Sequence, residues 1–130
     1  MTSWKLSSSS IKRLEGVHPE LVLVVKRALE LSPYDFGITE GVRDLETQKE
    51  YVNAGKSQTM NSKHLVQGDG HSHAIDFAVY VNGKLTWEIG YYRKVVQAFF
   101  TAAIELGVQI DSGALWRTFV DGPHIELKGQ

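Results

Sequence analysis

A predicted β-hairpin constrains the fold of this 130-residue chain more than any other feature. Residues alternate in character from Ala74 to Val81, and the dipeptide Asn82-Gly83 follows directly. Such alternation indicates a strand, and Asn-Gly is a strong signal for a two-residue hairpin turn, so we expect Lys84–Thr86 to form the return strand. Strand parity then predicts two faces: a core face with Ile75, Phe77 and Val79, and an opposite face with Ala74, Asp76 and Ala78.

Helical spacing of hydrophobic residues predicts helices before and after this hairpin. Ser7 to Ser10 can cap a short helix that Gly16 ends, and Pro19 begins a longer helix that ends at Ser32-Pro33. Two further helices are expected over 45–53, capped by Asp44, and over 87–106, closed by Gly107. Short strands are expected over 36–39, 108–110 and 123–127, with irregular stretches over 56–72 and 112–122. This order predicts an α+β fold, a small single domain over residues 1–130 with a mainly antiparallel sheet packed against helices.

Composition excludes several classes of protein. The chain has no cysteine, so disulfides and thiolate metal sites are ruled out, and its net charge of -1 provides no basic surface for nucleic acid. The longest hydrophobic stretch, residues 21–25, is far too short to span a bilayer, and residues 1–14 do not resemble a secretory signal peptide. We expect a monomer that does not bind nucleic acid or insert into a membrane.

Any metal must be held by histidine or carboxylate side chains, and the chain offers both in or beside the irregular stretches. Asp76 lies between two alanines on its strand face, which leaves space around a carboxylate; on pattern alone, an exposed aspartate on a solvated face is the better interpretation. Parity places His73 on the core face, so it is the weaker ligand candidate. Asp121 stands three residues before His124, where it could act as an acid/base group or simply form a turn. The five histidines are His18, His64, His71, His73 and His124.

Three separated motifs resemble those of one enzyme family. Ser62-Lys63-His64, Ala74-Ile75-Asp76 and Asp121-Gly122-Pro123-His124 follow the SxH…AxD…(D/E)xxH pattern of the M15 family of zinc metallopeptidases. That family includes D-Ala-D-Ala carboxypeptidases and dipeptidases and the phage L-alanyl-D-glutamate endopeptidases. Thr39-Glu40-Gly41-Val42-Arg43 is similar to a further segment of the family, and Gln48 matches a glutamine that often follows it. The resemblance runs from about residue 15 to the end of the chain.

The spacing between the first two motifs departs from the family pattern. The usual form is S-x-H-x-x-G-x-A-x-D, whereas residues 65–73 here separate His64 from Ala74. We interpret residues 66–70 as a loop insertion, because Gly-Asp-Gly is turn chemistry. His71 is closer to Asp76 in the sequence and is the alternative first ligand. We favour His64 because it carries the Ser-x-His context.

The resemblance implies one catalytic zinc ion, Zn2+, bound by His64, Asp76 and His124, with a water molecule in the fourth position. It implies that Asp121 is the catalytic acid/base and that Arg43 stabilises the oxyanion or holds a substrate carboxylate. A surface ion pair of Arg43 with Glu40 or Glu46 is the alternative interpretation. A substrate contact is also expected for Gln48, and either a substrate contact or the orientation of a ligand for Ser62. Glu126 is expected to have a supporting role, and Trp116 a place in the cleft or the core.

The resemblance further implies a Hedgehog/DD-peptidase-like fold and a phage or prophage endolysin that cleaves the L-alanyl-D-glutamate bond of the peptidoglycan stem peptide. Such an enzyme is made in the host cytoplasm without a signal peptide and reaches the periplasm by holin-type release. We expect no separate cell-wall-binding domain. One alternative is a D-Ala-D-Ala carboxypeptidase or dipeptidase. The other is a non-catalytic zinc-binding module of the same fold, against which the presence of both Asp121 and Arg43 argues.

Overall fold

The predicted hairpin forms the centre of the fold in the computed structural model, which describes residues 4–56, 60, 62–113 and 122–128. β2 (Ala74–Val81) pairs with β3 (Lys84–Thr86) through Asn82-Gly83, where both residues have positive φ. β1 (Asp35–Glu40), β4 (Ile110–Ser112) and β5 (His124–Leu127) complete an antiparallel sheet in the order β1-β2-β5-β4, with β3 beside β2. The expected α+β fold is confirmed.

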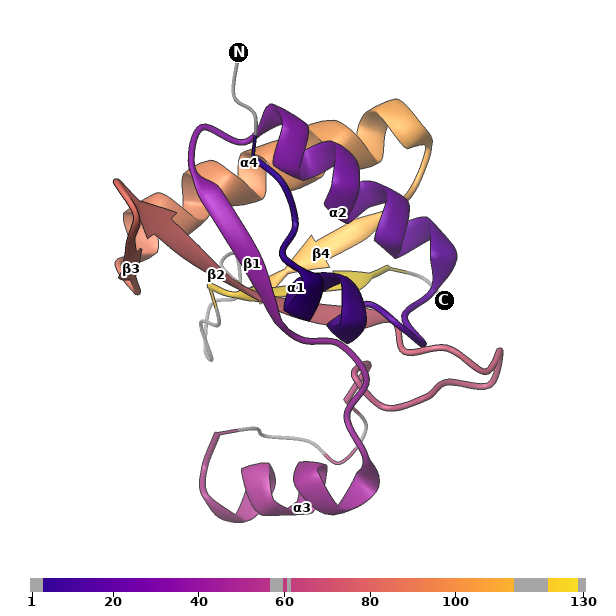
Figure 1. The fold of residues 1–130 in the computed structure, drawn as a ribbon. Helices are drawn as coiled ribbons and strands as arrows, with labels where there is room; N and C mark the ends of the chain where they lie inside the picture. Colours follow the sequence, from indigo (N-terminus) through magenta and orange to yellow (C-terminus); the bar gives the residue numbers. More distant parts are fainter. Residues whose placement is uncertain (1–3, 57–59, 61, 114–121, 129–130) are drawn as a thin grey trace.

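Two helices cover one face of the sheet (Figure 1). α2 (Pro19–Leu31) and α4 (Ile89–Leu106) pack against each other and against the core face of β2. Ile75, Phe77 and Val79 are fully buried there, as strand parity predicts. The Phe77 ring packs against Phe99 of α4, and together with their neighbours these side chains form the hydrophobic core.

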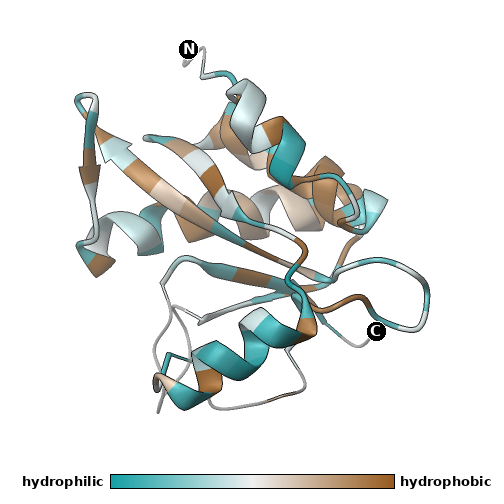
Figure 2. Cartoon of the chain, turned by 60° about the horizontal axis from the view of Figure 1, so that its bottom comes forward, coloured by the Kyte–Doolittle hydropathy of each residue, from teal (hydrophilic) through white to brown (hydrophobic). Residues whose placement is uncertain are grey.

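The opposite side of the sheet faces a helix of different character. α3 (Leu45–Asn53) stands apart from the helical layer in Figure 1, and Figure 2 shows that its residues are largely hydrophilic. Its only buried residue within the described chain is the polar Gln48. α3 is therefore held by specific polar contacts rather than by a hydrophobic stripe.

Local capping chemistry sets most helix ends where the sequence predicts them. The Ser7 hydroxyl accepts a hydrogen bond from the backbone N–H of Ser10 and begins α1 (Ser8–Arg13). The Asp44 carboxylate accepts one from Thr47 and begins α3. Gly107 ends α4 in the left-handed conformation, with φ of 70°, which glycine adopts without strain.

Some predicted boundaries are wrong by one or two residues. α4 begins at Ile89 rather than at residue 87, because Glu88 keeps an extended backbone as the N-cap. The strand predicted over 108–110 lies at Ile110–Ser112, since the Val108 N–H donates back to Ala103 to complete the helix end. β5 begins at His124 rather than at Pro123, which has no N–H to donate. Most of the irregular stretch predicted over 112–122 lies outside the described residues.

No helix in the described part of the chain has the length and hydrophobicity needed to cross a bilayer.

Candidate metal centre

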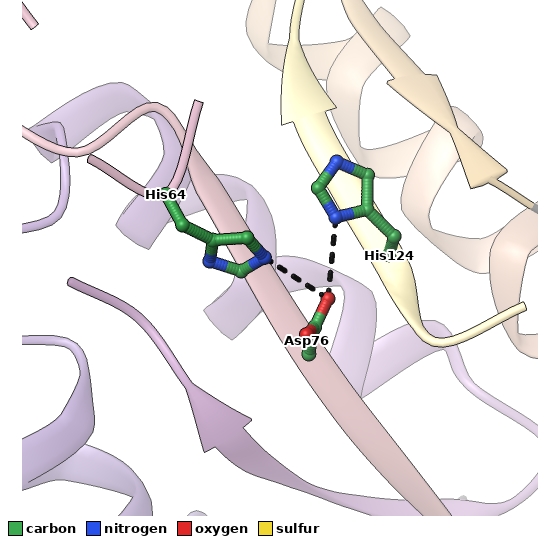
Figure 3. A group of neighbouring side chains, drawn as sticks. All are labelled: His64, Asp76 and His124. Carbon is green, nitrogen blue, oxygen red and sulfur yellow. Dashed lines mark hydrogen bonds and ion pairs between the residues drawn. The ribbon is translucent and has the colours of Figure 1, made fainter. Parts of the chain in front are cut away.

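His64, Asp76 and His124 converge on one point at the face of the sheet opposite the core (Figure 3). β2 carries Asp76 and β5 carries His124, and the strand register pairs these two residues directly. Nε2 of His64 and Nδ1 of His124 each lie 3.2 Å from Oδ1 of Asp76. One donor atom from each residue lies within 4.8 Å of the others, a separation at which they could hold a metal ion.

His64 is fixed from both its backbone and its ring. Its N–H donates to the Ser62 hydroxyl at 3.2 Å, and its carbonyl accepts from the N–H of Arg43 at 2.9 Å. Nδ1 lies 2.9 Å from the Gly41 carbonyl, which can only accept, so Nδ1 carries the proton. The Nε2 lone pair of this buried ring is therefore directed at the shared centre. Gly41 has to be glycine, because a Cβ there would lie 2.1 Å from the Arg13 carbonyl oxygen.

His124 is oriented by a carboxylate behind it. Its Nε2–H donates to Oε1 of Glu126 at 2.8 Å, which leaves Nδ1 facing Asp76. Burial lowers the pKa of His124, but hydrogen bonds to Asp76 and Glu126 outweigh burial and raise that pKa to about 9. Lys63 in turn lies 3.4 Å from Glu126. The supporting role expected for Glu126 thus matches a direct contact with the His124 ring.

Asp76 is largely enclosed, so the interpretation as an exposed aspartate on a solvated face is wrong. Burial raises its pKa, but hydrogen bonds to His124 and His64 outweigh burial and hold the pKa well below the usual range of a carboxyl group. A carboxylate and two imidazoles, each imidazole held by a partner on its far nitrogen, are a donor set suited to a divalent transition metal.

Arg43 lies beside the three-residue cluster and is almost fully buried, with 7% of its surface exposed. Nε and Nη2 donate to Glu40, and Nη1 donates to the Gln48 amide oxygen at 2.7 Å. Its guanidinium carbon lies 4.4 Å from the centroid of the Tyr51 ring. The alternative interpretation as an ion pair with Glu40 is correct in its partner, but the pair lies within the site.

The side chains predicted as alternative or weaker ligands lie elsewhere. His71 lies against His18, with ring centroids 5.6 Å apart, and Nε2 of His73 lies 2.7 Å from an oxygen of Asp69. Neither joins the cluster within the described residues. The inserted loop closes on itself through a bridge between Val66 and Ser72. Asp121 and Trp116 lie outside the described residues.

Sequence reasoning missed the way in which α3 supports Arg43. Gln48 is fully buried and touches Arg43, although the sequence predicts a substrate contact for it. Tyr51 was not singled out at all. The available signal was helical spacing. Gln48 and Tyr51 are three residues apart, so they share a face of α3, and that face would point back toward the segment that precedes the helix.

Comparisons with known proteins give one consistent result. A family model described as phage L-alanyl-D-glutamate peptidase matches residues 2–128. The L-alanyl-D-glutamate peptidase of Escherichia phage T5 is 40% identical over 140 residues, covering 96% of this chain and 98% of that protein. The crystal structure of the Serratia marcescens L-Ala D-Glu endopeptidase ChiX superposes with a TM-score of 0.86 at 38% identity, covering 95% of this chain and 90% of that one.

Proposed function

Because the chain belongs to the phage L-alanyl-D-glutamate peptidase family, we propose that it is a zinc-dependent endopeptidase that cleaves the L-alanyl-D-glutamate bond of the peptidoglycan stem peptide. The observation that carries the proposal is the convergence of His64, Asp76 and His124 from three separate segments. Three protein ligands leave one position open, which is the arrangement of catalytic rather than structural zinc sites.

The residues present fit a zinc ion. The far nitrogen of each histidine is hydrogen-bonded to an acceptor, Gly41 for His64 and Glu126 for His124, so both near nitrogens face the centre. The raised pKa of His124 means that its Nδ1 carries a proton at neutral pH, which a bound zinc ion would displace. Asp76 adds the oxygen donor through Oδ1. When bound, zinc lowers the pKa of a coordinated water to about 7 and polarises the scissile carbonyl.

Arg43 supplies the positive charge beside this centre. Glu40 and Gln48 fix the plane of its guanidinium group, so it needs little reorganisation to stabilise negative charge that develops on the substrate carbonyl oxygen. Since Gln48 is fully buried, we propose that it acts on the substrate through Arg43 rather than by direct contact. The Ser62 hydroxyl accepts from the N–H of His64, which supports a role in orienting that ligand.

Asp121 is our candidate for the catalytic acid/base. Its position three residues before His124 supports this role, because a turn at Gly122-Pro123 separates it from the strand that carries the ligand. In that role its carboxylate takes a proton from the attacking water and passes it to the leaving amine of D-glutamate.

We further propose a monomeric single domain over residues 1–130 that acts on the wall from the periplasm after holin-type release from the host cytoplasm. The similarity to the L-alanyl-D-glutamate peptidase of Escherichia phage T5 supports a phage setting.

The test is digestion of purified peptidoglycan followed by mass spectrometry of the products. The proposal predicts peptides that begin with D-glutamate and glycan strands that keep a single L-alanine. A D-Ala-D-Ala carboxypeptidase would instead release free D-alanine, and a non-catalytic module would release nothing. Either of these results with zinc-loaded protein contradicts the assignment.

A further inference from the structure

We propose that a groove at the beginning of α4 binds the sugar to which the stem peptide is attached, with Trp87 stacking on the sugar ring. This inference rests on the proposed function, because it extends the same substrate beyond its scissile bond. Figure 1 shows β3, the first turn of α4 and the beginning of β5 at one end of the molecule. The groove there has a volume of about 420 Å³ and is lined by Trp87, Ile89, Tyr92, Arg93, Gly122 and Pro123.

Trp87 is a preformed flat platform. It is 61% exposed, yet one face of its indole stacks on Tyr92 with ring centroids 6.0 Å apart and an angle of 12° between the planes. Tyr92 is itself fixed, since its hydroxyl donates to the Thr86 carbonyl at 2.7 Å and accepts from the N–H of Val79 at 3.1 Å. A large aromatic side chain held on one face and open on the other can bind a ligand at low cost in conformational entropy.

The chemistry of the lining suits an uncharged sugar. The C–H face of a pyranose ring is apolar and flat, and an indole offers it a large amphipathic surface. Ile89 adds an apolar wall. Arg93 is exposed at the rim and forms no salt bridge within the residues that the structure describes, so its five N–H donors are available for hydroxyl and N-acetyl oxygens.

The groove and the metal centre are linked by adjacent residues of the chain. Gly122 and Pro123 line it, and the next residue is the proposed ligand His124. Gly122 lies tightly against α4, because a Cβ at this position would lie 2.8 Å from Cδ1 of Ile89. This wall therefore has a fixed position relative to both the groove and the ligand.

The separation of Trp87 from the metal centre is also of the same order as the dimensions of the substrate. Val79 pairs with Thr86, the residue before Trp87, and lies three residues along β2 from Asp76, which is about 10 Å of strand. In peptidoglycan the L-alanine on the amino side of the scissile bond is joined directly to the lactyl group of the muramic sugar. That sugar therefore lies within about two residue lengths, or roughly 7 Å, of the bond to be cut.

The experiment compares two substrates that share one peptide: the N-acetylmuramyl tetrapeptide and the same tetrapeptide without the sugar. We expect wild-type protein to show a kcat/KM roughly tenfold higher for the sugar-bearing form, mainly through KM. Trp87→Ala should bring that ratio close to one, and Trp87→Tyr, which keeps a stacking ring, should retain most of it. Leu85→Ala is the matched control, since Leu85 is 50% exposed on the neighbouring strand but does not line the groove.

Direct titration of the protein with the muramyl saccharide lacking any peptide, followed by calorimetry, gives a second readout that needs no hydrolysis. Binding to wild type and to Leu85→Ala but not to Trp87→Ala supports the inference. Equal kcat/KM values for the two substrates in wild-type protein, or a ratio that survives in a folded Trp87→Ala variant, overturns it. Failure to cleave either substrate contradicts the proposed function instead, and the titration then decides the sugar site alone.

Discussion

Nη2 of Arg43 lies 3.6 Å from Oδ2 of Asp76, whereas Oδ1 of the same carboxylate faces both histidines. The two oxygens of Asp76 therefore have separate surroundings, one cationic and one shared with the imidazoles. Arg43 is in turn held by Glu40 and Gln48, so the orientation of the aspartate depends on residues outside the ligand set.

The ligand set predicts one zinc ion per chain, lost when His64 is replaced. His64→Ala removes a donor atom whose position is fixed by contacts with Gly41 and Ser62. Elemental analysis of the purified variant should therefore find little zinc, and the variant should not hydrolyse peptidoglycan. His71→Ala is the matched control, because its ring lies against His18, away from the cluster. Zinc that is retained by His64→Ala and lost by His71→Ala would identify His71 as the ligand instead of His64.

Asp121→Asn should separate catalysis from zinc binding. The amide keeps the shape of the side chain but cannot accept a proton, so kcat should fall by roughly 10²–10⁴-fold while the zinc content stays at one per chain. A turn-forming aspartate predicts the reverse: a lower melting temperature and near-normal kcat per folded molecule. Zinc content, melting temperature and kcat measured on this one variant distinguish these outcomes.

Glu40→Gln tests whether the orientation of Arg43 matters. Glu40 accepts from Nε and Nη2 of Arg43, and a neutral amide would hold the guanidinium more weakly. We expect kcat/KM to fall roughly tenfold with unchanged zinc content, as for other small losses of preorganisation. Glu46→Gln, an exposed carboxylate in the first turn of α3, should leave the rate unchanged. Equal effects of the two variants would exclude a specific role for Glu40.

The charges of Asp35 and Asp44 should have opposite effects on stability, and both effects should depend on pH. Burial raises the pKa of Asp35, whose Oδ1 is buried with no hydrogen-bond partner in the described chain. Its charge therefore destabilises the folded state above the folded pKa, and this penalty disappears as pH falls below the unfolded value of about 3.9. Asp35→Asn should raise the melting temperature at pH 7 by a few degrees at most and have little effect near pH 3.

The matched variant is Asp44→Asn. The hydrogen bond from the Thr47 N–H lowers the pKa of Asp44, so its charge contributes stability above the unfolded pKa that is lost as pH falls through the folded pKa. This variant should lower the melting temperature at pH 7 and have little effect at acidic pH. Thermal melts of both variants at the two pH values check the prediction, and shifts of the same sign at pH 7 would contradict it.

Features that depend on neighbouring residues were predictable from sequence. Alternation and Asn82-Gly83 specify the hairpin, and Asp44 specifies the beginning of α3, because turn and capping chemistry act within a few residues. The family resemblance suggested by the three motifs is confirmed by the match over residues 2–128.

The identity of the first ligand and the role of Gln48 could not be predicted from the sequence alone, because both depend on contacts between segments that meet only in the folded chain. The choice between His64 and His71 rests on which ring turns toward Asp76, and the contact of His64 with Gly41 comes from a segment more than twenty residues earlier. The burial of Gln48 likewise follows from the docking of α3 over Arg43. The contact of His64 with Gly41 leaves no periodic pattern in the chain, whereas helical spacing on α3 was an available signal for Gln48.

The bridge between Val66 and Ser72 closes the inserted loop at its base, so the two ends of the loop lie side by side. His73 donates its N–H to the Lys63 carbonyl, so the chain re-enters the sheet beside the residue that precedes His64. The number of residues between His64 and Asp76 is therefore not a measure of the distance between their side chains. A search pattern that fixes this gap would overlook chains such as this one, whereas a pattern that lets the gap vary and requires the flanking Ser-x-His and Ala-x-Asp would retain them.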